Sequence, residues 1–383
     1  MLVTFVLISL GRAALCPLRR HRPRGATTVA LSADVSVGLV GGWRGGSTDP
    51  DDAYAAELLS LVDRSWLSSV GVVRGNDLLP AEMFTATEAF VKTAGSAFRG
   101  PIVSGGASPL PTPTGVVWEG GASGENQPVP VCLNDAVEEM RKMLEYGPAT
   151  IVATGPLTDI ACLAIHYLQV LGNIEMLYVL AGRSPDETLW LPDRSTTAIF
   201  SDFNVAQDER AAIVVFNETS IPITVVPFSL SSSAVWTTEQ IQRLQSDDCT
   251  PRAQMFSRGT KTRLEFFKNV FNMDGILPFD ALVPWVYAKP SEFNCQDTTW
   301  TFVRCLTGSA GVFNGASNTC AGHGPNQPAS LNLEGWQLQL GSPQFTGRTV
   351  KWCPGWRDAA AQERFEREGP EIICKASRIS REE

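Results

Sequence analysis

The stretch Ser47-Thr48-Asp49-Pro50-Asp51-Asp52-Ala53-Tyr54 places three carboxylates within four residues, directly ahead of an alanine- and leucine-rich run. A glycine-rich segment precedes it, and residues 53–63 have the composition of a helix. Carboxylates at the start of a helix accept hydrogen bonds from free N–H groups and are stabilised by the helix dipole. Three carboxylates so close together also repel one another, and a divalent cation relieves this repulsion. Taken alone, the stretch therefore fits both an acidic helix cap and a metal site.

Outside this stretch, buried strands alternate with helices. We expect strands at 35–40, 66–73, 101–105, 149–153, 174–180 and 221–226, and helices at 81–94, 135–145, 208–216, 238–246 and 261–271. This alternation predicts an α/β fold with a doubly wound, mostly parallel central sheet flanked by helices.

Polar side chains follow several of the predicted strands. The acidic stretch, Asn76 and Thr154 come at strand ends, and Asn204 and Asp280 lie in later, less regular segments. Any one of these residues alone is typical of a turn or a cap. Because ligands of doubly wound sheets bind at the carboxyl ends of the strands, their convergence predicts a ligand site at that edge.

The composition narrows the function classes. The net charge of -9, with no basic stripe beyond the N-terminal segment, argues against a nucleic-acid partner. Three histidines leave little material for a zinc site or a Ser-His-Asp triad. Neither a Gly-x-Ser-x-Gly elbow nor a phosphate-binding loop occurs. A metal bound here is therefore expected to be a hard cation held by oxygen.

The N-terminal residues are apolar and then rich in arginine, with no acidic residue before Asp34. We expect 1–33 to be a targeting or disordered segment; secretory and organellar addresses both fit, so the compartment stays open. Residues 34–355 are expected to form one domain, with an inserted Cys/Gly-rich loop near 294–328. Residues 356–383 are expected to form a charged tail. No further segment reaches transmembrane length, so we expect no membrane partner for the mature form.

Six segments resemble the inosine–uridine nucleoside hydrolase family, the N-ribohydrolases. They are Asp-Pro-Asp-Asp-Ala at 49–53, and the segments 70–76, 101–107, 153–159, 202–212 and 279–282. Their order and spacing are more specific than any single motif. The resemblance implies a nucleosidase that hydrolyses the N-glycosidic bond of purine or pyrimidine ribonucleosides to free base and ribose.

The resemblance also implies a set of site residues around a Ca²⁺ ion. Asp49, Asp52 and Asp280 would be side-chain ligands, and Thr154 would be a carbonyl ligand. Asp49 would also be the catalytic base for a water molecule, and Asp51 would hold a ribose hydroxyl. Calcium suits this set because it accepts six to eight oxygen ligands in flexible geometry.

Four further residues belong to the implied substrate site. Asn76 and Asn204 would bind sugar hydroxyls, Asp202 would replace the usual glutamate, and Phe203 would lie on the side of the base. The family often forms dimers or tetramers, so a homo-oligomer is a further implication.

The acidic stretch departs from the family pattern, which reads Asp-x-Asp-Pro-Gly-x-Asp-Asp. With a gap of two residues after Pro50, Asp49 is the base. Without a gap, the base position falls on Gly45 and the chain has lost its base. The alternative function is therefore an impaired relative that binds a nucleoside or sugar without turnover.

Overall fold

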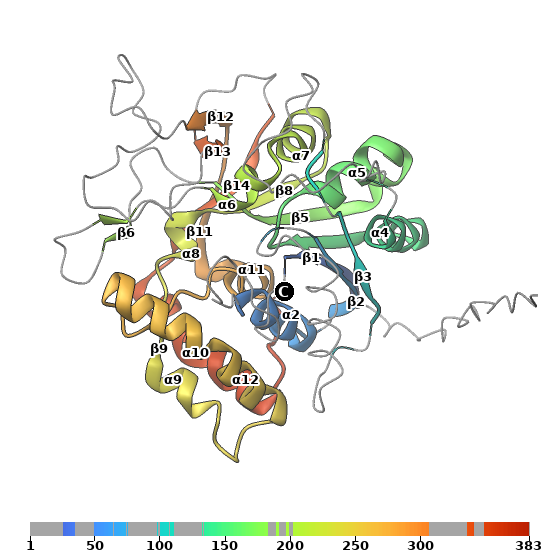
Figure 1. Ribbon diagram of the computed structural model, residues 1–383. Helices are drawn as coiled ribbons and strands as arrows, with labels where there is room; N and C mark the ends of the chain where they lie inside the picture. Colours follow the sequence, from blue (N-terminus) through green and yellow to red (C-terminus); the bar gives the residue numbers. More distant parts are fainter. Residues whose placement is uncertain are drawn as a thin grey trace, which may run out of the picture.

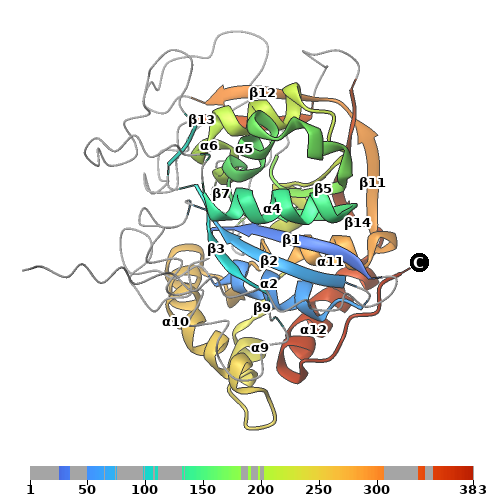
Figure 2. The ribbon, with the colours of Figure 1, turned by 90° about the vertical axis from the view of Figure 1, so that its right-hand side faces the viewer.

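A computed structural model describes residues 26–34, 50–63, 65–73, 75, 98, 100–106, 108–110, 132, 134–182, 189–190, 197–198, 202–305, 335–340 and 348–382. An eight-stranded sheet with the order β11-β14-β8-β5-β4-β1-β2-β3 lies between two layers of helices (Figures 1 and 2). Neighbouring strands are parallel except for the edge pair β11 and β14. The fold class predicted from the sequence is confirmed.

The sheet consists of β1 (Thr27–Ala33), β2 (Ser65–Val72), β3 (Ile102–Ser104), β4 (Ala149–Ala153), β5 (Ile174–Leu180), β8 (Ile223–Val226), β11 (Phe293–Thr298) and β14 (Val350–Trp356). Short antiparallel pairs are formed by β6 (Leu189–Trp190) with β7 (Thr197–Ala198), β9 (Trp236–Thr237) with β10 (Gly275–Ile276), and β12 (Trp300–Cys305) with β13 (Gly335–Leu340). The helices are α2 (Asp51–Leu61), α4 (Asp135–Tyr146), α5 (Thr158–His166), α6 (Phe203–Gln207), α7 (Glu209–Ile213), α8 (Phe228–Ser231), α9 (Thr238–Arg243), α10 (Pro251–Phe271), α11 (Leu282–Ala288) and α12 (Ala359–Lys375).

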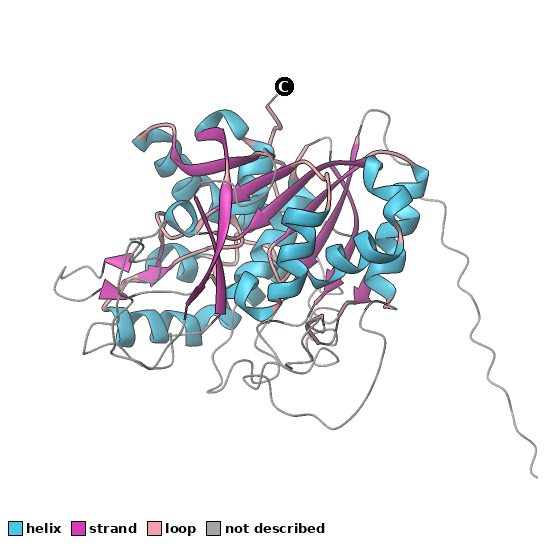
Figure 3. Cartoon of the chain, turned by 90° about the horizontal axis from the view of Figure 1, so that it is seen from above, coloured by secondary structure: helices cyan, strands magenta, loops and turns pink. Residues whose placement is uncertain are grey.

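Side chains of the central strands alternate between two hydrophobic cores, as a strand with a period of two requires. Val29, Leu31 and Val152 face the core formed with α2, α10, α11 and α12. Ala30 and Ile151 face the second core, formed with α4, α5 and α7. Figure 3 shows the resulting sandwich, with helices on both sides of the strands. Both faces of the sheet are covered, which explains the continuous apolar runs of the strands.

The strand order reverses between β1 and β4. The chain runs outward from β1 through β2 to β3, and then returns to add β4, β5, β8 and β14 on the other side of β1. The crossover connections on either side of this point therefore diverge. In a doubly wound sheet, such a topological switch point opens a crevice at the carboxyl ends of the two strands.

Both ends of the expected domain need correction. Strand β1 lies inside the span expected to be a targeting or disordered segment, yet it is central in the sheet and its residues from Val29 to Ala33 are buried. The fold therefore begins before residue 34. At the other end, helix α12 buries Phe365 and Ile373 in the first core, and Ile379 packs there too. Residues 359–382 are therefore part of the domain rather than a tail.

The expected insert near 294–328 is also partly structured. Its first residues belong to β11, which pairs with β14 at the edge of the sheet, and 300–305 form β12. The expected helix at 81–94 and the expected strand at 35–40 lie outside the described residues. No helix of the described ranges is long and apolar enough to cross a membrane.

Three disulfides connect distant segments of the described chain. They are Cys132–Cys162, Cys249–Cys374 and Cys295–Cys353. The second closes a separation of 125 residues and fastens the end of α12 to the segment before α10. Cross-links of this kind restrict the unfolded chain and persist in oxidising compartments.

A buried ion pair joins α2 to α10. Glu57 and Arg252 lie 2.6 Å apart, and their side chains are 2% and 1% exposed. The Arg252 guanidinium also lies over the ring of Phe256, which packs against Tyr54 of α2. The pair therefore helps to fix the helix that carries the acidic stretch against the rest of the first layer.

We expect Glu57→Gln to lower the free energy of unfolding by about 3–5 kcal/mol, because the buried guanidinium loses its counter-charge. Urea unfolding at neutral pH measures this change. Glu138→Gln is the matched control, since Glu138 pairs with Arg141 on the surface of α4, and its loss should cost below ~1 kcal/mol. Equal losses of unfolding free energy in the two variants would contradict the assignment of Glu57 and Arg252 as a stabilising buried ion pair.

Candidate functional site

Buried polar groups meet at the switch point between β1 and β4. Asp34 directly follows β1, and Thr154 and Gly155 directly follow β4. The backbone N–H of Thr154 donates to the Ser32 carbonyl at 2.9 Å, which continues the strand pairing to the last residue before the turn. The two strand ends therefore lie side by side where the topology predicts a ligand.

Gly155 allows the Asp34 carboxylate to lie against this turn. A Cβ atom at position 155 would lie 2.8 Å from both the backbone nitrogen and Oδ1 of Asp34. A Cβ atom at Gly75, after β2, would lie 2.0 Å from Asp34 Oδ2. Asp34 itself is only 2% exposed. Its carboxylate is thus enclosed by the ends of β2 and β4, and any larger residue at either glycine would displace it.

Helix α2 brings the acidic stretch to the same turn. Asp51 and Asp52 form its first turn and are 2% and 0% exposed. Thr154 Oγ1 donates to Asp52 Oδ1 at 2.7 Å. The backbone N–H of Asp280 contacts Asp51 Oδ2 at 3.4 Å. Pro50 is the N-cap of α2, and both carboxylates are buried beside the strand ends, so a role as an acidic cap alone does not account for them.

The α6 segment closes the other side. Asn204 Nδ2 donates to the Thr154 carbonyl at 2.6 Å and to the Leu180 carbonyl at 3.0 Å, and so joins the ends of β4 and β5. Both amide hydrogens are therefore used, which leaves Oδ1 as the polar atom that Asn204 can offer to a ligand. Asp202 Oδ2 accepts from the Gly182 N–H at 2.8 Å, after β5. Phe203, between the two, is half-buried.

The structure thus gathers most of the predicted site residues at one edge of the sheet. Asp51, Asp52, Thr154, Asp202, Phe203, Asn204 and Asp280 lie at or beside the strand ends through the contacts above. Asp49 and Asn76 lie outside the described residues, so their predicted roles stay predictions.

Asp34 is the residue that sequence reasoning missed. One pattern could have identified it: Asp34 directly follows the mostly apolar run from Val29 to Ala33, as expected at the end of a strand. This run, however, lies in the span that we expected to be a targeting segment. In the structure Asp34 is an aspartate at the end of the strand that defines the switch point. Its position is therefore as favourable for chemistry as that of the acidic stretch.

The described acidic residues of the site offer oxygen donors only, which is the chemistry that a hard cation prefers. Asp52, Asp280 and the Thr154 carbonyl are all buried in this group. Over the described ranges, no three histidine, cysteine, aspartate or glutamate side chains form a group that could hold a metal ion. The donor chemistry therefore fits calcium, and the described part of the chain contains no preassembled cluster.

Two further buried carboxylates follow the site segments in the chain: Asp159 comes after the Thr154–Gly155 turn, and Asp208 comes after Asn204. Burial raises the pKa of Asp159, in the first turn of α5, to about 6. Burial also raises the pKa of Asp208 to about 6, with a smaller contribution from the charge of Asp159. Hydrogen bonds from their neighbours oppose the rise in both cases. Neither residue was a sequence candidate.

Comparison with known proteins places this arrangement in a known fold. A plant nucleoside hydrolase aligns over 91% of this chain and 99% of its own, with a TM-score of 0.64 and 14% identity. A purine-preferring ribonucleoside hydrolase from Gardnerella vaginalis aligns over 92% of this chain and 100% of its own, with a TM-score of 0.60 and 13% identity. At these identities the likeness defines the fold: that of the nucleoside hydrolases.

The family follows from the sequence match. The model of the inosine-uridine preferring nucleoside hydrolase family matches residues 47–334, and the chain belongs to this family. A pyrimidine-specific ribonucleoside hydrolase of Photobacterium profundum is 34% identical over 134 residues, which is 34% of this chain and 39% of that protein. The chain thus spans less than half the length of the curated relatives it matches.

The raised pKa values predict how stability depends on pH. A carboxyl whose pKa rises from 3.8 to about 6 on folding stabilises the folded state below pH ~4, and this contribution is lost as the pH rises through about 6. For Asp159 the loss is worth ~3 kcal/mol at neutral pH. We expect Asp159→Asn to remove this loss and to flatten the stability profile between pH 4 and 7, as measured by thermal unfolding.

Asp358→Asn is the control with the opposite sign. The hydrogen bond from Arg357 lowers the pKa of this exposed residue at the start of α12, so its contribution is present at neutral pH and is lost on acidification. A profile of Asp159→Asn that superimposes on that of the unchanged protein would show that Asp159 does not titrate as described.

Proposed function

We propose that this protein hydrolyses the N-glycosidic bond of ribonucleosides to free base and ribose. The observation that carries the proposal is that Asp34 and Asp52 are both buried against the Thr154–Gly155 turn, at the switch point of a nucleoside hydrolase fold. Burying a carboxylate is unfavourable, and buried carboxylates in a ligand-binding crevice are candidates for functional residues. The relatives whose names specify pyrimidine or purine nucleosides do not agree on a base, so the proposal covers both classes.

We further propose that calcium is the cofactor. Asp52 and Asp280 would hold it through their carboxylates and Thr154 through its carbonyl, whose second lone pair stays available beside the bond from Asn204. When bound, calcium would supply a positive charge that acidifies a water molecule and holds a vicinal diol. Asp51, adjacent in the chain, would hold a ribose hydroxyl.

The general base is proposed to be Asp34. Its carboxylate lies at the end of β1 against the Thr154–Gly155 turn, where a water molecule beneath the sugar could transfer its proton. Asp49 was the candidate from the sequence, and it is the competing candidate for this role. The acidic motif of the family is then divided here, with one aspartate at the end of β1 and two at the start of α2.

The remaining residues would hold and polarise the sugar. Asn204 offers Oδ1 to a hydroxyl, and Asp202 and the predicted Asn76 would complete the sugar contacts. Fixed negative charge near the ring stabilises the oxocarbenium-like charge that develops as the bond to the base breaks. The half-buried ring of Phe203 offers a face on which a nucleobase can stack.

Hydrolysis is tested by incubating the purified protein with inosine and uridine in the presence of calcium and measuring reducing sugar. Asp34→Asn is expected to lower kcat by roughly a hundredfold or more, because general-base catalysis contributes about 10²–10⁴-fold. Asp49→Asn, the matched variant, should stay within about threefold of the unchanged protein at saturating calcium, since in this proposal Asp49 is neither the base nor one of the calcium ligands, the second role that its sequence motif implied.

A large loss in Asp49→Asn with Asp34→Asn still active would reassign the base to Asp49. No sugar from any nucleoside, with the fold intact by circular dichroism, would refute hydrolysis. Nucleoside binding under those conditions would instead support the alternative, a relative that binds its ligand without turnover.

Calcium binding is tested separately by isothermal titration calorimetry on protein treated with a chelator. Asp280→Ala is expected to abolish the binding, because a carboxylate ligand is lost from the site. Asp274→Ala, which removes an exposed aspartate a few residues earlier, should leave the affinity unchanged. Equal calcium affinity in all three proteins would contradict the ligand assignment.

A further inference from the structure

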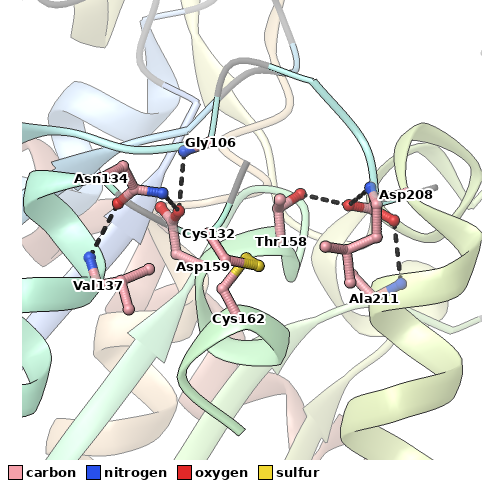
Figure 4. The surroundings of a disulfide bond; sticks show 10 residues. Gly106, Cys132, Asn134, Val137, Thr158, Asp159, Cys162, Asp208 and Ala211 are labelled. Carbon is pink, nitrogen blue, oxygen red and sulfur yellow. Dashed lines mark hydrogen bonds between the residues drawn. A yellow bond between two sulfur atoms is a disulfide. The ribbon is translucent and has the colours of Figure 1, made fainter. Parts of the chain in front are cut away.

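Two buried aspartates outside the proposed catalytic machinery connect the segments that carry it. Asp159 is 0% exposed in the first turn of α5, and Asp208 is 2% exposed between α6 and α7. Figure 4 shows the two carboxylates with the groups that they bind and the neighbouring disulfide Cys132–Cys162.

Asp159 attaches the segment after β3 to α5. Its Oδ1 accepts from the Gly106 N–H at 2.8 Å and from Asn134 Nδ2 at 2.9 Å. Asn134 in turn caps α4 by accepting from the Val137 N–H at 2.9 Å. A Cβ atom at Gly105 would lie 2.2 Å from Asp159 Oδ2, so glycine is required for this close approach.

Asp208 makes a second attachment. Its Oδ2 accepts from Thr158 Oγ1 at 2.6 Å and from the Leu110 N–H at 3.0 Å. Its Oδ1 accepts from the Ala211 N–H at 3.0 Å and so caps α7. One carboxylate therefore binds the segment after β3, the start of α5 and the start of α7.

Asn204 and Asp208 are four residues apart, and they bind two residues, Thr154 and Thr158, that are also four residues apart. Asn204 binds the Thr154 carbonyl at 2.6 Å, and Asp208 binds the Thr158 hydroxyl at 2.6 Å. The segments 154–158 and 204–208 are thus joined at two points with the same spacing. Two points of attachment fix both the separation and the relative orientation of the segments, whereas one point leaves them free to pivot.

We propose that Asp208 is a positioning residue that, through Thr158, sets the Thr154 carbonyl and the Asn204 side chain in register for the sugar and its cation, while Asp159 fastens the start of the same helix to the segment after β3. This inference rests on the proposed function for its catalytic consequence. The geometric part stands without it, because the hydrogen bonds hold the segments whether or not a substrate turns over. The disulfide from Cys132 to Cys162, one turn after Asp159, adds a covalent attachment to the same helix.

Thr158→Val tests the proposal. The substitution removes the hydroxyl that Asp208 binds, keeps the side-chain shape and leaves the cap on α7 in place. Misplacement of reacting groups by about 1 Å can cost up to ~100-fold in rate, so we expect kcat/KM to fall by roughly tenfold or more, chiefly in kcat. Thr158→Ser, which restores the hydroxyl, should recover most of the activity.

Thr224→Val is the matched control. Thr224 is a buried threonine of β8 whose hydroxyl contacts the sulfur of Met176. Its substitution should leave kcat/KM within about twofold of the unchanged protein, because it joins no two site segments. Equal kinetic losses in Thr158→Val and Thr224→Val, or no rescue by serine, would overturn the positioning role.

Hydrogen exchange separates this inference from the proposed function. The Leu110 amide should exchange faster in Thr158→Val than in the unchanged protein, because Asp208 loses the partner that holds its Oδ2 in place. The Thr224→Val protein should exchange at the original rate there. If the Leu110 amide of Thr158→Val exchanges at the original rate, the attachment through Asp208 is overturned. If the protein without substitutions shows no turnover, only the proposed function is refuted.

Discussion

The close approach of the Thr154–Gly155 turn to the end of β1 is the constraint on which the rest of the site depends. Ser32 and Thr154 continue the pairing of β1 with β4 to its last residue, and the missing side chain at Gly155 leaves room for Asp34. From this point the contacts spread to α2 through Asp52 and to α6 through Asn204. Asp52 and Asn204 bind Thr154 directly, and Asp34 lies against Gly155.

The buried carboxylates at the switch point differ from another buried carboxylate described above, that of Glu57. Glu57 is neutralised by Arg252 a single contact away, which is the usual condition for an ionised group in a protein interior. At the switch point, the buried carboxylates of Asp52 and Asp202 accept hydrogen bonds from the Thr154 hydroxyl and the Gly182 N–H. The helices, ion pair and disulfides around the site stabilise a scaffold that can tolerate the cost of burying these carboxylates.

Much of the fold could be predicted because the central strands are continuous apolar runs. Strands β4 and β5 lie at 149–153 and 174–180, as expected, and α4 begins after Asn134 as the cap predicted. β1 was missed because it is rich in small and polar residues and is preceded by an arginine-rich segment typical of targeting peptides. Residues 356–383 were expected to form a charged tail because charged residues surround the few apolar ones that α12 buries.

The residues of the candidate site also divide into those that the sequence could identify and those that it could not. Asp51, Asp52, Thr154, Asn204 and Asp280 could be found because they stand in recognisable local motifs. Asp34 lies outside these motifs. Asp159 and Asp208 lie inside the matched segments 153–159 and 202–212, but their role comes from neighbours distant in sequence, Gly106 and Leu110. Local patterns identify groups that bind ligands, whereas groups that hold segments together become visible only in three dimensions.

The central position of β1 limits how the N-terminus of this protein can be processed. Ala26 is buried and Thr27 begins the strand that pairs with both β2 and β4. A peptidase that cut at the boundary first expected, after residue 33, would remove the strand between the two halves of the sheet. Any cleavage that keeps this sheet intact would therefore have to fall ahead of Ala26.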